Sequence, residues 1–242
     1  MLMDYSSFEI TYHVEIAIVI DATGGMNPII QELKDNAMDF YRRFAEIMKK
    51  EGEKLSVMRV KIIVFRDFAY DGDKALEESR FFNLPEESED FRNYVEQIQV
   101  FGGGDEPANA LEALAVAMRS DWTTEKKPGI VALRHVILLF TDSIAAPLKD
   151  ASRPWSSKCA RVDNPIYPEN MPANLEELGH MWEGELGGMP NKRSKRIVLF
   201  APNVQPWNEI VWNQSWQLYS KPDGLADVDI NILIDIACNC LF

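Results

Sequence analysis

The sequence has few cysteines and histidines, and it has no excess of basic residues. Three cysteines and three histidines occur in 242 residues, and 25 Lys and Arg stand against 38 Asp and Glu, for a formal net charge of −13. An odd number of cysteines is interpreted as reduced thiols in a reducing compartment. The spacing of His13, His135 and His180 does not fit a zinc site. The acidic charge argues against nucleic acid and against an anionic membrane surface as partners.

Long apolar runs are also missing. The run at residues 16–20 is far too short to span a bilayer. The opening MLMDYSSFEI lacks the basic segment and the apolar core of a signal peptide. We therefore expect a cytoplasmic protein with no membrane partner. An apolar fraction of 46% is sufficient for a sizeable core, and the length fits one domain over residues 1–242.

Apolar stretches of strand length alternate with stretches of helical periodicity. This pattern is typical of a parallel sheet covered by helices on both faces. We predict an α/β, three-layer, doubly wound fold of Rossmann-like type, with a mostly parallel six-stranded sheet and one antiparallel edge strand. Expected strands include 13–20, 58–65, 76–84, 136–141 and 196–201, and expected helices include one between Asn27 and Gly52 and those at 86–98, 107–118, 175–186 and 229–241.

Two of the predicted strands end in a carboxylate. Asp21 follows the first strand and Asp142 follows the most apolar one. In open parallel sheets, ligands bind beyond the carboxyl ends of the strands. The glycine-rich segment 102–105 leads into a helix start that would lie between these two ends. The three loops are therefore predicted to converge on one crevice.

The residues at this crevice suit a hard divalent cation. Such ions take about six oxygen ligands from carboxylates, hydroxyls and water. Asp21 and Thr23 lie two residues apart in one loop, so both side chains can turn toward one ion, and Gly24 and Gly25 allow close approach of the backbone. The sequence thus predicts a site for Mg²⁺, or for Mn²⁺ or Ca²⁺.

Three motifs resemble those of von Willebrand factor type A (vWA) domains. The sequence DATGGM at 21–26 resembles the metal-site motif, GGGDEP at 102–107 resembles the second metal loop of bacterial members, and LLFTD at 138–142 resembles the third element, in which the Asp usually reaches the metal through water. The order and spacing agree over essentially the whole chain. The resemblance points to the bacterial intracellular branch of the family.

The resemblance also implies a function. It indicates a metal-dependent, MIDAS-type protein–protein interaction module that acts as a non-enzymatic adaptor or assembly factor. In this family, an acidic side chain of the partner protein completes the metal shell. The implied metal set here is Asp21, Thr23, position 25, Asp105 and Asp142.

Two positions depart from the family pattern. Gly25 replaces the second hydroxyl of the motif, so one direct ligand is missing and the metal is expected to be bound weakly. Asp105 aligns with a threonine of the family. If it faces the ion, three carboxylates surround the dication, which would then be held more firmly but attract an acidic partner less. Asp105 is equally compatible with capping the helix that follows.

Other functions remain open from the residues alone. The same fold could serve as an interaction domain with a degenerate, metal-free site. A Mg²⁺-dependent phosphohydrolase could use Asp21 as nucleophile, but such enzymes generally carry a second Asp two residues on, where this chain has Thr23. We therefore expect no enzymatic activity. Arg66 and Asp67, after the second strand, are interpreted as an ordinary ion pair at the strand end.

A proline-rich insertion at about 143–172 separates Asp142 from the next predicted helix. Loops of this length inside a compact domain are usually functional. Because the insertion leaves the sheet at Asp142, it begins at the rim of the crevice. We hypothesise that it shapes which partner can approach, and the alternative is a lid that merely covers the sheet end.

Overall fold

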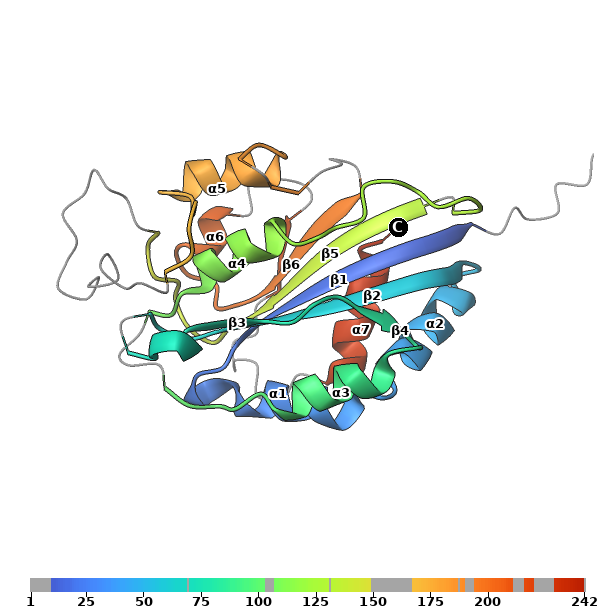
Figure 1. The fold of residues 1–242 in the computed structure, drawn as a ribbon, viewed down its shortest axis with the longest axis horizontal. Helices are drawn as coiled ribbons and strands as arrows, with labels where there is room; N and C mark the ends of the chain where they lie inside the picture. The colour runs from blue at the N-terminus through green and yellow to red at the C-terminus, as the bar shows by residue number, and fades with distance from the viewer. Residues whose placement is uncertain are drawn as a thin grey trace, which may run out of the picture.

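A mostly parallel sheet runs through the centre of the protein (Figure 1). The computed structural model describes residues 10–68, 70–102, 107–130, 132–148, 167–186, 188–189, 194–210, 216–219 and 229–241. Within these residues the sheet has seven strands in the order β3-β2-β1-β5-β6-β7, and β4 also pairs with β2. The strands are β1 (Thr11–Asp21), β2 (Lys54–Phe65), β3 (Leu76–Glu78), β4 (Phe82–Leu84), β5 (Ala132–Phe140), β6 (Lys195–Phe200) and β7 (Trp216–Tyr219).

The register of the sheet brings the strand ends together. Strand β1 pairs in parallel with β2 and β5, and β5 and β6 are also parallel. Asp21 lies opposite Phe65, and Ile20 lies opposite Phe140. The residues that follow β1, β2 and β5 therefore emerge at the same edge of the sheet, which we call the carboxyl edge.

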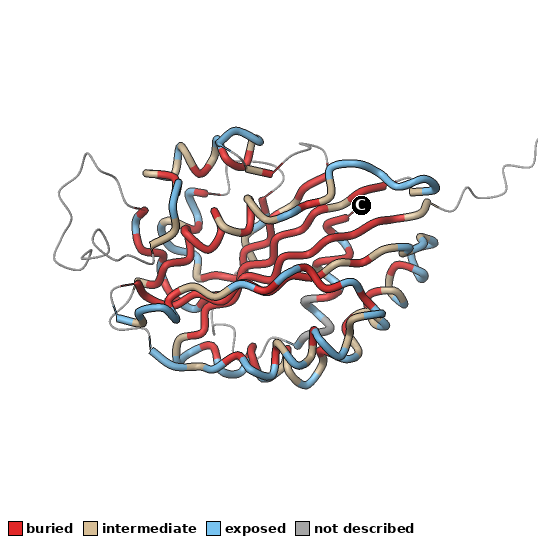
Figure 2. The backbone as a smooth tube through the Cα atoms, viewed as in Figure 1, coloured by how far each residue is buried: buried red, intermediate tan, exposed pale blue. Residues whose placement is uncertain are grey.

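Helices cover both faces of the sheet, as the predicted three-layer architecture requires. Two groups of helices, named below, cover the two faces. The first group packs on one face against alternate residues of β1, namely Val14, Ile16, Ile18 and Ile20. On the other face, Ala17 and Val19 pack against the second group. Figure 2 shows the strands buried between these layers. The first group contains α1 (Asn27–Asn36), α2 (Phe40–Lys50), α3 (Ser88–Glu96) and α7 (Ile230–Asn239), and the second contains α4 (Ala110–Met118), α5 (Leu175–Trp182) and α6 (Trp207–Ile210).

The six strands predicted become seven, partly because the predicted strand 76–84 is two strands. Both β3 and β4 pair antiparallel with β2. Between them, the Ser79 hydroxyl accepts a hydrogen bond from the Ile62 amide at 2.9 Å and donates one to the Arg80 carbonyl at 2.7 Å. The side chain thus takes the place of a backbone ladder bond and interrupts the strand. The short parallel edge strand β7 was not predicted.

The helix predicted between Asn27 and Gly52 is also divided. Helix α1 ends at Asn36 and α2 begins at Phe40. The Asn36 side chain donates to the Glu32 carbonyl at 2.8 Å, and such local bonds compete with the helical pattern. Gly52, with φ +80°, follows the end of α2 as predicted. No helix among the described residues is long and apolar enough to cross a membrane.

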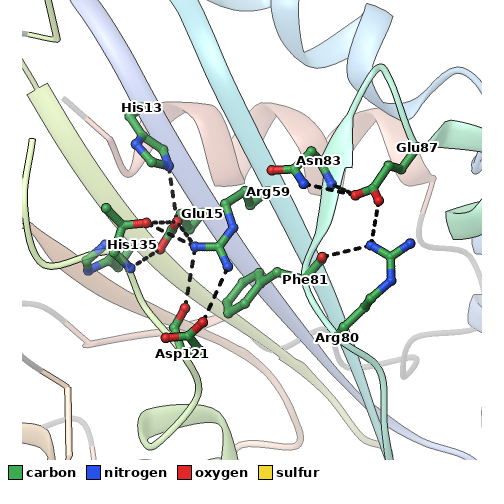
Figure 3. A network of polar contacts seen from close by, with 10 residues as sticks. His13, Glu15, Arg59, Arg80, Phe81, Asn83, Glu87, Asp121 and His135 are labelled. Atoms are coloured by element: carbon green, nitrogen blue, oxygen red, sulfur yellow. Dashed lines mark hydrogen bonds and ion pairs between the residues drawn. The ribbon is translucent and has the colours of Figure 1, made fainter. Parts of the chain in front are cut away.

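A buried carboxylate, Glu15, ties several strands together in the first half of β1 (Figure 3). Glu15 is fully buried. Its carboxylate lies 2.5 Å from the Arg59 guanidinium, and it accepts hydrogen bonds from the Thr123 amide and hydroxyl at 2.8 and 2.6 Å. His13 Nε2 and His135 Nε2 lie 3.1 and 3.3 Å from its oxygens. The network joins β1, β2, β5 and the α4–β5 connection. His13 and His135 are therefore part of a buried network that stabilises the fold.

The pKa of Glu15 is held well below its ordinary value. Burial alone would raise this pKa, but the hydrogen bonds with His13, His135 and Thr123 outweigh burial. A carboxyl with a lowered folded-state pKa adds stability above its unfolded-state pKa and loses it as the pH falls. The Glu15 network should therefore stabilise the fold fully at neutral pH and progressively less below about pH 4.5, the ordinary value for this group.

Replacing Glu15 with Gln should lower the unfolding free energy at pH 7 by about 3–5 kcal/mol, because one partner of a buried ion pair is removed. In urea unfolding, the difference in unfolding free energy between wild type and Glu15→Gln should narrow from about pH 5 to about pH 3, because protonation of Glu15 removes its contribution in the wild type. The control is Glu46→Gln, which breaks an exposed pair with Arg42 and should change the stability little, because solvent screens such pairs. A gap that stays constant with pH would contradict this account.

Candidate functional site

Asp21 is the centre of the candidate site. It ends β1 in the middle of the sheet and is fully buried. The Thr23 amide and hydroxyl donate to its Oδ1 at 2.9 and 2.7 Å, and the Thr141 hydroxyl donates to its Oδ2 at 2.8 Å. Both carboxylate oxygens are therefore oriented by donors from two different loops.

Asp142 lies against the same loop. The residues on either side of it are fixed: the Thr141 hydroxyl binds Asp21 and accepts a hydrogen bond from the Ser143 amide at 3.1 Å. The Asp142 side chain is exposed. A Cβ atom added at Gly25 would come within 1.7 Å of Asp142 Oδ2, so this carboxylate occupies the space that a side chain at position 25 would need.

The structure thus brings together four of the five positions in the predicted metal set. Asp21, Thr23, Gly25 and Asp142 meet at the carboxyl edge through the contacts just described. The fifth, Asp105, lies outside the described residues. Among the residues that are described, no three His, Cys, Asp or Glu side chains form a group that could hold a metal ion. A cation here would depend on two carboxylates, one hydroxyl and water.

The electrostatics of Asp21 differ from those of Glu15. Burial raises the pKa of Asp21, the hydrogen bonds from Thr23 and Thr141 oppose this effect, and the nearby charge of Asp142 raises the pKa further. The donors to Asp21 are neutral groups. A dication between the two carboxylates would offset their repulsion, and an all-oxygen set is the type that Mg²⁺ and Ca²⁺ prefer. The residues present fit a sparse hard-cation site.

Arg66 has a larger role than the predicted ion pair with Asp67. Its guanidinium is fully buried and lies 2.9 Å from Glu77 Oε1, rather than forming the pair predicted with Asp67. It also donates to the carbonyls of Lys74 and Gln99 at 2.6 and 2.7 Å. One side chain therefore binds the β2–β3 connection and the segment that follows α3. The sequence signal was available, because a basic residue directly after a buried strand requires several acceptors.

The segment held by Arg66 is bonded to the loop that carries Thr23. The Arg66 guanidinium lies 4.2 Å from the centre of the Phe101 ring, and the Phe101 amide donates to the Ala22 carbonyl at 3.1 Å. The next residue, Gly102, has φ +70°, and a Cβ there would approach Asp71 Oδ1 to 1.9 Å. The positive φ favours glycine at position 102, and any side chain there would also have to displace the Asp71 carboxylate.

Both ends of the proline-rich insertion are attached near α4. On the entry side, the Ala146 amide donates to the Ala108 carbonyl at 2.8 Å. On the exit side, the Tyr167 hydroxyl donates to Glu112 Oε1 at 3.0 Å, and its ring lies 5.1 Å from that of Phe68. Residues 149–166, which make up most of the predicted insertion at 143–172, lie outside the described residues.

Several tryptophan side chains pack in the core. Trp182, Trp207 and Trp216 are buried, and Trp182 and Trp216 meet edge to face with ring centres 5.4 Å apart. The Trp207 indole donates to the Ser143 carbonyl at 2.9 Å. This bond from α6 fixes the backbone next to Asp142.

Comparison with known proteins finds relatives of the fold only. No protein-family model matches the sequence, and no curated protein matches it. Among solved structures, the chain is similar to the pilus adhesin SpaC from Lactobacillus rhamnosus GG, with TM-scores of 0.53 (open conformation) and 0.55 in two structures. Identity is 10%, and the match covers 95% of this chain and 30% of the adhesin.

Two further similar structures have lower TM-scores. Proximal thread matrix protein 1 from the mussel byssus, with a zinc-occupied MIDAS motif, gives 0.44 at 14% identity over 93% of this chain and 46% of that protein. The vWF domain of the pili tip protein Mfa5 from Porphyromonas gingivalis gives 0.36 at 14% identity over 60% of this chain and 42% of that one. The likeness to the adhesin shows a shared α/β fold. This chain spans less than a third of the adhesin's length.

Replacing Arg66 with Met should lower the unfolding free energy by about 1–3 kcal/mol, because the bonds of the guanidinium to Glu77 and to the Lys74 and Gln99 carbonyls are lost. Amide hydrogen exchange should also increase in the two segments that contain Ala22 and Phe101. Arg66 binds the Gln99 carbonyl, and the nearby Phe101 amide bonds to the Ala22 carbonyl. Arg80→Met is the matched control, since Arg80 is half exposed and its pairs with Glu87 and Asp90 lie at the surface. Equal exchange at residues 20–26 and 98–102 in wild type and Arg66→Met would refute the link between the loops.

Proposed function

We propose that this chain is a protein-interaction module of the vWA type, and that a protein partner binds at its carboxyl edge. The observation that carries the proposal is the meeting of Asp21, Thr23 and Asp142 in one place, each from the end of a central strand. Ligand sites at the carboxyl ends of parallel strands are the rule in open α/β sheets. The likeness to a pilus adhesin over 95% of the chain supports the fold on which this proposal is based.

A divalent cation is proposed to be part of the binding surface. Mg²⁺ is favoured by the oxygen-only set, and Mn²⁺ or Ca²⁺ would fit the same donors. When bound, the cation supplies positive charge at an edge where two carboxylates would otherwise repel each other. The chain's own contribution is to hold Asp21 with three hydrogen bonds, so that its free lone pairs point in fixed directions.

The partner is proposed to complete the shell with an acidic side chain. The proposed setting is the cytoplasm of a bacterium, where the module would act as an adaptor or assembly factor without catalysis. A phosphohydrolase is disfavoured because Thr23, whose hydroxyl is bonded to Asp21 Oδ1 at 2.7 Å, stands where a carboxylic general acid would be needed.

A metal-free interaction module is the second candidate. Two observations favour it: neutral donors already bind both oxygens of Asp21, and Asp142 already fills the space beside Gly25. Both candidates place the partner at the same edge. They differ in whether chelation of metal weakens partner binding.

Partner capture by the wild type should require both Mg²⁺ and Asp21. With 1 mM Mg²⁺ the wild-type chain should retain a specific partner that is lost with EDTA, and Asp21→Ala should fail to retain it in either condition. Thermal unfolding provides the parallel measurement, since a ligand at about 100 times its Kd adds about 2.7 kcal/mol to stability. The control is Asp39→Ala, at a half-exposed residue paired with Arg42. Capture that persists in EDTA and depends on Asp21 would favour the metal-free candidate, whereas capture unaffected by Asp21→Ala would refute both.

Deleting residues 150–165 should change which partner is retained without unfolding the domain. The attachments at Ala146 and Tyr167 lie outside the deleted stretch. The measurement compares the proteins captured by wild type and the shortened chain, with urea unfolding as the control for folding. Retention of every native partner would show that the insertion has no role in selection.

A further inference from the structure

The contact between Gly25 and Asp142 is specific to that position. A Cβ at Gly25 would lie 1.7 Å from Asp142 Oδ2 and 2.8 Å from its Cγ. At Gly24, one residue earlier in the same short 3-10 helix, the added Cβ would have no atom within 4 Å. Crowding of the loop in general does not explain this difference. The missing side chain of residue 25 and the carboxylate of residue 142 use the same volume.

We propose that Asp142 takes the place of the missing hydroxyl and binds the cation directly, instead of through a water molecule. This inference rests on the proposed metal site. In the motif that this chain resembles, position 25 would carry the second hydroxyl ligand. Here the ligand atom comes from a different loop, at the end of β5, and glycine at position 25 is what admits it.

The backbone around Asp142 is built to present its side chain at this place. Thr141 is bound to Asp21 Oδ2 through its hydroxyl. Ser143 donates its amide to that same hydroxyl and accepts the Trp207 indole at its carbonyl. Asp142 therefore lies between two residues that are fixed to the site and to the core, while its own carboxylate remains exposed.

The exchange also alters the charge at the site. A hydroxyl is a neutral ligand, whereas Asp142 adds a full negative charge beside Asp21. Two carboxylates that contact a dication directly neutralise its charge. The stronger electrostatic attraction therefore compensates for the missing hydroxyl ligand. The same offset reduces the attraction of the ion for an acidic side chain, so the acidic partner proposed above should bind more weakly than it would at a site with one carboxylate.

Substitution at Gly25 separates direct from water-mediated binding. Gly25→Ala places a Cβ where the Asp142 carboxylate lies and adds no ligand, so the Kd for Mn²⁺, measured by calorimetry on the metal-free chain, should rise at least about tenfold, as for lost metal-site contacts. Gly24→Ala is the matched control and should stay within roughly twofold, since its Cβ meets no atom within 4 Å. Gly25→Ser should bind Mn²⁺ more tightly than Gly25→Ala, because it restores the hydroxyl.

Asp142→Ala tests the same ligand without altering the glycine loop. In the wild-type background it should raise the Kd for Mn²⁺ at least about tenfold. In the Gly25→Ser background, where Asp142 is displaced, it should have a smaller effect, because two changes that act on one interaction are not additive. Urea unfolding in EDTA should be nearly the same for all variants, since the displaced atoms belong to the end of an exposed side chain.

The outcomes distinguish this inference from the proposed metal site. Wild type that binds Mn²⁺ while Gly25→Ala or Asp142→Ala binds equally well, or more tightly, would overturn the direct role of Asp142 and leave the metal site standing. Wild type that binds no Mn²⁺ at millimolar concentration would overturn both.

Discussion

The buried carboxylate of Asp21 is the constraint on which the carboxyl edge depends. It ends the central strand, and its hydrogen bonds with Thr23 and Thr141 join the loop after β1 to the loop after β5. An ionised carboxylate in this position is costly unless its charge is balanced. The loops are thus held together by a group whose negative charge the proposed cation would balance.

Glu15 and Asp21 belong to the same strand and show two ways of burying a carboxylate. Glu15 faces the Arg59 guanidinium and several donors, and its pKa is lowered. Asp21 has neutral donors and a second carboxylate nearby, and its pKa is raised. A balanced buried charge fixes structure, whereas an unbalanced one at a strand end is typical of a functional site. The structural network thus lies in the first half of β1, and the candidate site lies at its carboxyl end.

Much of the fold and of the site could be predicted, and the failures have local causes. The strand ends at Asp21 and Asp142 were predictable because buried parallel strands have continuous apolar runs. The division at Ser79 and the break at Asn36 were not, because both involve a hydrogen bond between a polar side chain and a nearby backbone group, and sequence periodicity does not report such bonds. The need of Arg66 for several acceptors could be predicted, but their identity could not, because one of them is the Gln99 carbonyl, 33 residues along the chain.

The relation between Gly25 and Asp142 shows why a motif compared position by position can mislead. The loss of a hydroxyl at residue 25 predicts a weakened site when only the first loop is considered. In three dimensions the vacated volume is filled by a carboxylate from a strand end about 120 residues later in the chain, where Thr141 is bonded to Asp21. The absence of a side chain at Gly25 and the position of the Asp142 carboxylate therefore depend on each other. The ligand set of such a site is defined by which atoms share a volume, and the glycine is as much a part of it as the carboxylate.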